Sequence, residues 1–349
     1  MDSLDLIRSL QRRMPWALAR KLFGALGIVK SQGWDSTLAA IESGEPLSDD
    51  VVAKLKTALD DHILYGEKLV RFYELTESEA AVLRKRIQSE EITSGLISDR
   101  FPLLLPQNEL EKHEFLDPVP VGRIIRDEDT ALVFGAARRT TFRVPLDIEF
   151  VPVEARDYFS GYSELVGIRD VRLQTLDVIS VHTTKPVVEV RCDFPEGMTG
   201  EALAVSIAHA HNFISETIGE ERDALNLFEA MGKMFRAKDE GTVVEAAFTT
   251  QTASIKHERM RRRRYSLREE PYHMAGREAV QDALEVFKLA IRWDVEVQEG
   301  LVTIPEAFFS STVKMLSGKT PPVLYDVTIS GCLSKVDFEY ARSRILAYV

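Results

Sequence analysis

The chain has 349 residues, of which 45% are hydrophobic and 28% charged, and it carries a formal net charge of −11. A chain of this length buries the cores of two or three domains, so the composition excludes global disorder. The acidity excludes a protein that is basic over its whole surface, as nucleic-acid coat proteins are, but it leaves room for a local basic site.

Residues 1–95 predict a bundle of helices. Apolar residues recur at helical spacing through three short helices, the last of which ends at Gly44. Ser48 then begins a longer helix that we expect to continue through Tyr73, and a capping-box pattern begins another helix at Thr76. Compact helical modules of this kind most often bind other proteins or present a helix to DNA, and we expect this bundle to dock a protein partner.

A linker is predicted at residues 96–118. Its prolines, which include Pro102, Pro106 and Pro118, block the continuation of a helix and favour an extended connection. We place the domain boundary here, so that residues 119–349 form a second domain.

After the linker the apolar pattern changes to a period of two, which is typical of strands. A β-hairpin is predicted over residues 121–134, with a turn at Asp127-Glu-Asp129. Two further short strands are predicted at residues 141–144 and 148–151.

The strongest predicted hairpin joins residues 171–181 to residues 187–192, because two β-branched runs flank a short polar turn. The second run alternates between apolar residues (Val188, Val190, Cys192) and charged residues (Glu189, Arg191, Asp193). This alternation predicts one solvent-facing side, and therefore an antiparallel sheet.

The remaining predicted elements are helices at 199–218, 221–235, 277–293 and 336–347, and strands at 242–249, 252–258 and 323–329. The amphipathic pattern is clearest from Arg277 to Trp293. Together these elements predict the α+β class, in which an N-terminal helical bundle precedes a larger, mixed and mainly antiparallel sheet packed on helices.

The segment from Lys256 to Arg268 holds seven Lys or Arg residues and a single acidic residue, Glu258. Arginines this close repel one another unless an anion, an acidic surface or water takes up their charge. Guanidinium groups bind phosphates through paired hydrogen bonds, and a tyrosine stacks on bases. The candidate anion-binding residues are Lys256, Arg259, Arg261, Arg262, Arg263, Arg264, Tyr265 and Arg268.

This basic run is expected at the end of a strand or in the loop after it, and a loop suits a polyanion better than a two-sided strand does. The alternative is that the arginines pair with acids of their own fold, such as Glu269 and Glu270.

A second anion-binding candidate is the segment from Gly135 to Arg143, which we interpret as a turn. It combines small residues with Arg138, Arg139 and Arg143, and backbone amides with arginines are the groups that an anion pocket needs. It lacks the Gly-Lys-Ser/Thr ending of a phosphate loop, so nucleotide hydrolysis is not implied.

Carboxylates give no clear catalytic set. Asp177, Glu189 and Asp193 fall on neighbouring predicted strands, as the acids of metal-dependent nucleases do, but Arg191 stands where the catalytic lysine of those enzymes is expected. The sequence has no nucleophile elbow, dinucleotide fingerprint, zincin motif or kinase motif. We therefore predict no catalytic residue, no metal ligand and no cofactor.

These observations favour a non-enzymatic interaction protein that binds nucleic acid or another polyanion through its arginines with low sequence selectivity. One alternative is a metal-dependent nuclease or another enzyme acting on phosphorylated substrates. A second alternative is an assembly subunit whose arginines dock on an acidic protein surface, and a homo-oligomer is compatible with this pattern.

The sequence also bears on the compartment. Cys192 and Cys332 are too few for a disulfide framework, which indicates a reducing environment. The N-terminus lacks a signal-peptide core, and no apolar run approaches the ~18 residues of a membrane span. We expect a soluble cytoplasmic protein without membrane contact, or a nuclear one if the source is eukaryotic.

Overall fold

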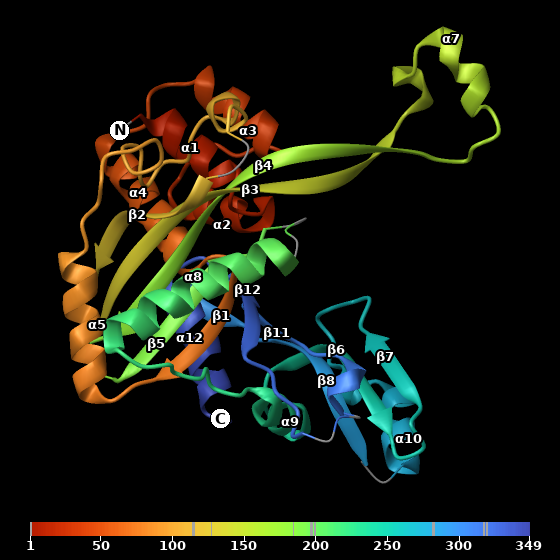
Figure 1. Cartoon of the computed structure of the whole chain (residues 1–349). Helices are drawn as coiled ribbons and strands as arrows, with labels where there is room; N and C mark the ends of the chain where they lie inside the picture. Colours follow the sequence, from red (N-terminus) through yellow and green to blue (C-terminus); the bar gives the residue numbers. More distant parts are fainter. Residues whose placement is uncertain are drawn as a thin grey trace.

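A computed structural model of the chain describes residues 2–113, 116–126, 128–183, 185–195, 198, 200–280, 283–316, 318 and 320–349. In these residues the chain forms one large sheet with helices on both sides (Figure 1). The helices are α1 (Ser3–Gln11), α2 (Trp16–Ala25), α3 (Trp34–Glu42), α4 (Asp49–Tyr65), α5 (Glu77–Ser89), α6 (Gln107–Leu110), α7 (Val153–Arg156), α8 (Gly200–Ile218), α9 (Phe228–Arg236), α10 (Pro271–Ala279), α11 (Val313–Leu316) and α12 (Lys335–Leu346).

The strands of the large sheet are β1 (Lys68–Glu74), β2 (Leu116–Ile125), β3 (Asp129–Leu146), β4 (Leu165–His182), β5 (Val187–Asp193), β6 (Thr242–Thr250), β7 (Ile255–Arg259), β8 (Leu284–Arg292), β11 (Glu306–Ser310) and β12 (Asp326–Ser330). Among the described residues their order is β2-β3-β4-β5-β1-β12-β11-β8-β6-β7, and neighbouring strands are antiparallel. Strands β9 (Val295–Gln298) and β10 (Leu301–Thr303) form a separate pair. The predicted α+β class is confirmed.

The N-terminal segment is helical through α4, but the predicted continuation of that helix to Tyr73 is wrong. The helix ends at Tyr65, and the next residues form β1, which pairs with β5 on one side and β12 on the other. Both faces of this central strand are buried, so its apolar residues follow no clean period of two. The domain division at residues 96–118 stays a prediction.

The predicted helix from Arg277 to Trp293 is also wrong. Helix α10 ends at Ala279, and β8 begins at Leu284 between β11 and β6. Buried residues lie on both faces of β8, so its dense apolar run matches a helical pattern as well as a strand.

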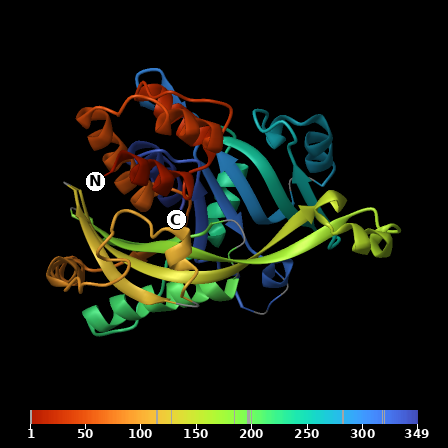
Figure 2. The same ribbon diagram turned by 90° about the horizontal axis from the view of Figure 1, so that it is seen from above.

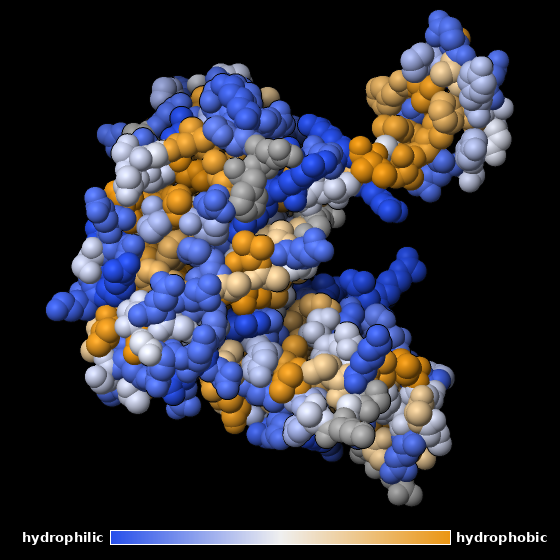
Figure 3. Space-filling model, in the orientation of Figure 1, coloured by the Kyte–Doolittle hydropathy of each residue, from blue (hydrophilic) through white to orange (hydrophobic). Residues whose placement is uncertain are grey.

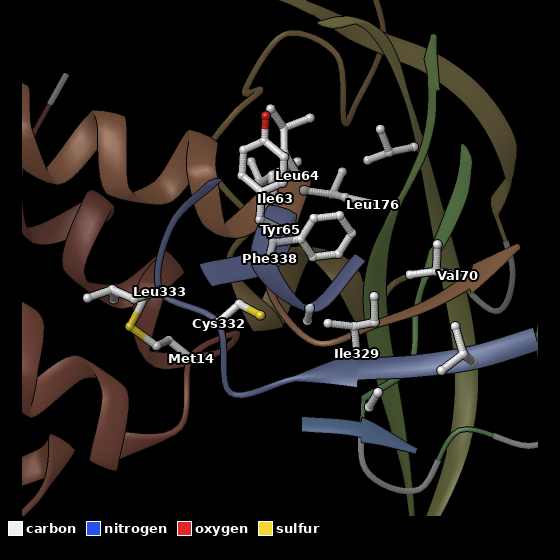
Figure 4. Packing of buried hydrophobic residues seen from close by; sticks show 14 of the residues in the cluster. Met14, Ile63, Leu64, Tyr65, Val70, Leu176, Ile329, Cys332, Leu333 and Phe338 are labelled. Carbon is white, nitrogen blue, oxygen red and sulfur yellow. The ribbon is translucent and has the colours of Figure 1, made fainter. Parts of the chain in front are cut away.

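Helices lie on both sides of the sheet (Figure 2), and a hydrophobic cluster lies on each of its two faces. Successive residues of a central strand point to opposite faces and so belong to different clusters. In β1, for example, Val70 lies in the larger cluster and Leu69 in the smaller one. One cluster packs under α5 and α8, and the larger one packs under α1–α4, α9 and α12. Figure 4 shows part of the larger cluster, where Tyr65 of α4 lies beside Phe338 of α12 with their ring centroids 5.4 Å apart.

The covering helices overturn the predicted solvent-facing side of the hairpin β4–β5. The antiparallel pairing is confirmed, but Glu189, Arg191 and Asp193 are at most 5% exposed. These charged side chains are buried under the N-terminal helices and α12, and each forms ion pairs with other buried side chains, as described below.

Strands β3 and β4 form a long hairpin that extends away from the body of the protein (Figure 1). Residues 135–143, interpreted above as a turn, lie within β3 and pair with β4 along their whole length. The strand predicted at residues 148–151 is instead a 3₁₀ turn, Ile148–Phe150, at the tip of the hairpin.

Other predicted elements agree with the structure. The hairpin at residues 121–134 is β2–β3, the helix at 199–218 is α8 and the C-terminal helix is α12. The helix predicted from Glu221 begins only at Phe228. Within the described ranges, no helix combines the length and the apolarity needed to cross a bilayer.

Candidate anion-binding surface

The basic run begins in β7, the outermost strand of the sheet, and continues into the loop that leads to α10. The predicted position at a strand end and in the following loop is therefore confirmed. Residues Lys256 and Arg259 lie on the strand, whereas Arg261–Tyr265 lie in the loop. An edge strand and a loop present long side chains to solvent, which is what binding of a large anion requires.

The Arg268 side chain is hydrogen-bonded within the protein, so it is not one of the residues available to bind an anion. Its guanidinium donates hydrogen bonds to the backbone carbonyls of Met234, Phe235, Glu240 and Gly241, at 2.6–3.1 Å. The carbonyls of Met234 and Phe235 lie in the last turn of α9, where helices leave acceptors unpaired, and those of Glu240 and Gly241 lie just beyond the helix. Burial lowers the pKa of Arg268 from its ordinary value. Arg268 therefore caps a helix.

Arg263 and Arg259 are compensated by acids from other strands, and the Arg259 partner lies directly opposite on the neighbouring strand β6. The Arg263 Nη2 lies 2.6 Å from Glu306 Oε2 of β11, and Arg292 of β8 pairs with the same carboxylate at 3.3 Å. The Arg259 Nε lies 3.3 Å from Glu245 Oε2 of β6. The compensating acids are thus Glu245 and Glu306, rather than the neighbouring Glu269 and Glu270 that the sequence suggests.

Arg264 faces solvent and holds Tyr265. Its guanidinium carbon lies 4.8 Å from the centroid of the Tyr265 ring, and its Nη2 donates a hydrogen bond to the Tyr265 hydroxyl at 2.8 Å. Tyr265 remains 46% exposed, so this pair offers an aromatic face with a charge beside it.

Lys256, Arg261 and Arg262 are exposed. In the part of the chain that the structure describes, no acidic side chain forms an ion pair with any of the three. Together with Arg264 and Tyr265 they define what we call the basic surface. Four cations without an acidic partner on one short segment repel each other, and a bound polyanion would relieve that repulsion.

The second group of arginines does not join this surface. Arg138 is buried and donates a hydrogen bond to Ser206 Oγ of α8 at 3.0 Å. Arg139 pairs with Asp170 across the hairpin, and Arg143 is exposed farther along β3. Seven strands lie between β3 and β7 in the strand order of the described residues.

The carboxylates considered for a nuclease are occupied by protein groups. Asp193 accepts hydrogen bonds from Arg13, at 2.8 and 2.9 Å, from Lys68 Nζ at 2.5 Å and from the Leu176 amide at 2.7 Å. Burial opposes its ionisation, but Arg13 and Lys68 outweigh burial and hold the pKa of Asp193 below its ordinary value. Asp177 accepts from the Asp193 amide at 2.9 Å, and burial followed by the Asp193 charge raises its pKa.

Glu189 belongs to a different buried cluster. It pairs with Arg191 at 2.9 Å and with Arg342 of α12, while the Arg191 guanidinium lies over the rings of Phe338 and Tyr65, at 4.7 and 5.1 Å from their centroids. Because the three carboxylates are divided between two ion-pair networks, they do not converge on a cation. Among the described residues, no group of three His, Cys, Asp or Glu side chains is arranged to hold a metal ion.

Sequence reasoning located the basic surface but did not separate its free cations from its structural ones. The compensating acids, Glu245 and Glu306, belong to β6 and β11, and nothing in the sequence next to Arg259 and Arg263 marks them. It also missed an exposed apolar segment between Val144 and Ile168, although Phe150, Tyr158 and Tyr162 stand there among polar residues.

Comparison of the chain with protein-family models, with curated proteins and with solved structures finds no match.

Proposed function

We propose that the protein is a non-enzymatic interaction protein that binds a polyanion, in the first instance nucleic acid, through the basic surface. The observation that supports this function is the group of exposed cations without acidic partners on β7 and its following loop. Arg259 adds a charge that Glu245 compensates only in part, since its side chain is 66% exposed. Arg263, through Glu306, and Arg268, through the carbonyls at the end of α9, attach the loop to the rest of the protein.

The expected mode of binding follows from the residue types. Arginine and lysine on a flexible loop contact phosphates, and Tyr265 stacks on an unpaired base. These groups read the backbone and the aromatic faces common to all bases, so selectivity for sequence is low, and single strands bind at least as well as duplexes. The proposal includes an intracellular setting, where such polyanions occur, and a protein partner on the N-terminal helices.

The experiment is fluorescence-anisotropy binding of the full chain to labelled single-stranded and double-stranded DNA and RNA at low salt. The test variant replaces Lys256, Arg261, Arg262 and Arg264 by alanine. The matched control replaces Arg20, Lys85, Lys185 and Lys238, which are exposed cations scattered over other elements. Both variants change the net charge equally, so the control isolates position from overall charge.

Micromolar or tighter binding by the wild type and the control, lost in the test variant, is the expected result. Equal loss in both variants, or no binding by the wild type, would contradict the proposal. No arrangement in the described residues favours the nuclease alternative.

A further inference from the structure

The hairpin β3–β4 carries a surface that the proposed function does not use. We call residues 141–170 the arm. Beyond Ala137 and Gln174, the two strands pair with each other alone among the described strands. The nine residues from Arg138 to Leu146 therefore project about 30 Å beyond the sheet.

The arm has no core of its own. None of its 30 residues is buried. A ribbon of only two strands is marginally stable in water by itself. Arg156 fastens the turn at the tip by donating to the carbonyls of Glu149 and Val151, at 2.8 and 2.9 Å. Local hydrogen bonds thus shape the tip, but its side chains stay uncovered.

Apolar side chains concentrate on this arm, as Figure 3 shows near its tip. Ten of the 25 exposed large hydrophobic residues of the described chain lie in it, including Phe150 at 84% exposure and Tyr158 at 82%. The ten are Val144, Leu146, Ile148, Phe150, Val153, Tyr158, Phe159, Tyr162, Val166 and Ile168. Exposed apolar sets of this size mark interaction surfaces.

The charge of the arm indicates what covers it. The arm has six acidic and three basic residues, a net charge of −3. Within the described residues, five of the acids (Asp147, Glu149, Glu154, Asp157 and Glu164) have no cationic partner. An acidic apolar tip is repelled by anionic lipid headgroups and by nucleic acid, and it fits a basic protein surface with apolar residues beside it.

The chain itself has such a surface at the other end of its sheet. The basic surface has four cations without acidic partners, and β7 begins at Ile255, which is 57% exposed. A cavity of about 660 Å³ lies there, lined in part by Ala253, Ile255, Leu284 and Leu316. The cavity is large enough for an aromatic side chain. The five residues of β7 place it about 17 Å from the arginines of the loop, and the arm is long enough to reach both.

We infer that the arm of one copy of this chain docks on the basic surface of a second copy. Phe150 and its neighbours cover the cavity at Ile255, and the unpaired acids of the tip lie against Arg261, Arg262 and Arg264. A stable interface needs about 800 Å² and 20–30 residues on each side, which the arm is long enough to supply. Reciprocal exchange of two arms about a two-fold axis closes the assembly as a dimer.

This inference does not rest on polyanion binding, but it concerns the same cations. A polyanion and the arm of a second copy therefore compete for the basic surface. The two proposals fail separately, because self-association and nucleic-acid binding are measured independently.

The test is sedimentation velocity of the full chain over a concentration series. A tip variant replaces Phe150, Tyr158 and Tyr162 by serine, which leaves the fold intact because all three side chains are exposed. A basic-surface variant replaces Arg261, Arg262 and Arg264 by glutamate. We expect a wild-type dimer at micromolar concentration and a dissociation constant raised about 100-fold or more in each variant.

Mixing the two variants distinguishes the modes of contact. The basic-surface variant has an intact arm and the tip variant an intact basic surface, so the mixture should recover association through one contact. A monomeric wild type, a tip variant that associates like the wild type, or a mixture that stays monomeric would each overturn the inference. Association that survives in the basic-surface variant alone would mean that arms contact arms, and would overturn it too.

If the tip variant loses the dimer and binds DNA at least as tightly as the wild type, the polyanion proposal stands on its own. If the wild type is a dimer that binds no nucleic acid, only the polyanion proposal fails.

Discussion

Replacement of Asp193 by asparagine should destabilise the protein strongly, because this carboxylate is the shared counter-ion of two buried cations. Lys68 is fully buried and Arg13 nearly so, and both donate to Asp193 at 2.5–2.9 Å. Asparagine has a similar shape but no charge, so both cations would remain buried without an acidic partner. Removing one partner of a buried pair costs about 3–5 kcal/mol of unfolding free energy.

The assay is urea unfolding of the wild type, Asp193→Asn and the matched surface variant Asp170→Asn. Asp170 pairs with Arg139 on the exposed arm, where an ion pair contributes about 1 kcal/mol or less. The Asp193 variant should also melt about 4–7 °C below the wild type, because a loss of about 3–5 kcal/mol is divided by the large unfolding entropy of a chain of this length. Adding Lys68→Met to Asp193→Asn removes one stranded cation, so the double variant should be more stable than the sum of the two single effects predicts.

A loss of less than about 1 kcal/mol in Asp193→Asn, or equal losses in Asp193→Asn and Asp170→Asn, would refute this reasoning. Either result would mean that Lys68 and Arg13 find other partners or water when the carboxylate is lost.

Three further predictions follow from the contacts. The Nε2 of His62 donates to the Arg13 carbonyl at 2.9 Å, and burial followed by the Arg13 charge lowers the pKa of His62 from 6.5 to about 4. As the pH falls from 6.5 to 4, the unfolded chain binds a proton on His62 before the folded chain does, so the histidine lowers the unfolding free energy by up to about 3 kcal/mol. The His62→Gln variant should therefore lose less stability than the wild type over this range when both are unfolded in urea. Parallel pH profiles of the two proteins would contradict the assignment. Asp61, whose pKa burial raises to about 6, acts in the opposite sense in both proteins and leaves that difference unchanged. Arg268→Ala should cost about 3 kcal/mol by urea unfolding, since four carbonyls at and beyond the end of α9 lose a charged donor, whereas Arg264→Ala should change stability by less than about 0.5 kcal/mol. A single-stranded oligonucleotide should dissociate the wild-type dimer in sedimentation velocity, and a complex that keeps the dimer mass would contradict shared use of the basic surface.

Local signals in the sequence predicted much of the fold correctly. The capping box at Thr76 and Glu79 begins α5 as expected, and the β-branched runs at residues 171–181 and 187–192 form β4 and β5. These elements depend on neighbours a few residues away, which the sequence displays directly.

Strands buried on both faces were the main source of error. Leu69, Val70, Phe72 and Tyr73 of β1 are all buried, so the alternation that marks a half-exposed strand is missing. The apolar run of β8 failed for the same reason. Charged residues caused the opposite error. Glu189, Arg191 and Asp193 alternate as surface residues do, but they have buried partners in the turn after α1, in β1 and in α12.

The candidate site shows the same limit. Charge density placed the basic surface correctly in the loop after β7, because that signal is local. The distinction between Arg268, which caps α9, and Arg261, which is free, depends on carbonyls and acids that the fold brings in from other strands and helices. No spacing within residues 256–268 carries that information.

The most direct test of the polyanion proposal is the salt dependence of binding to single-stranded DNA. Each phosphate neutralised by Lys or Arg releases a counter-ion, so four cations predict a slope of log affinity against log salt of about −3. The variant that lacks Lys256, Arg261, Arg262 and Arg264 should bind too weakly for a slope to be measured, or show residual binding with a slope near zero, and the scattered-cation control should keep the wild-type slope. Equal slopes for the wild type and the variant would contradict the proposal, because the binding energy would then come from elsewhere on the protein.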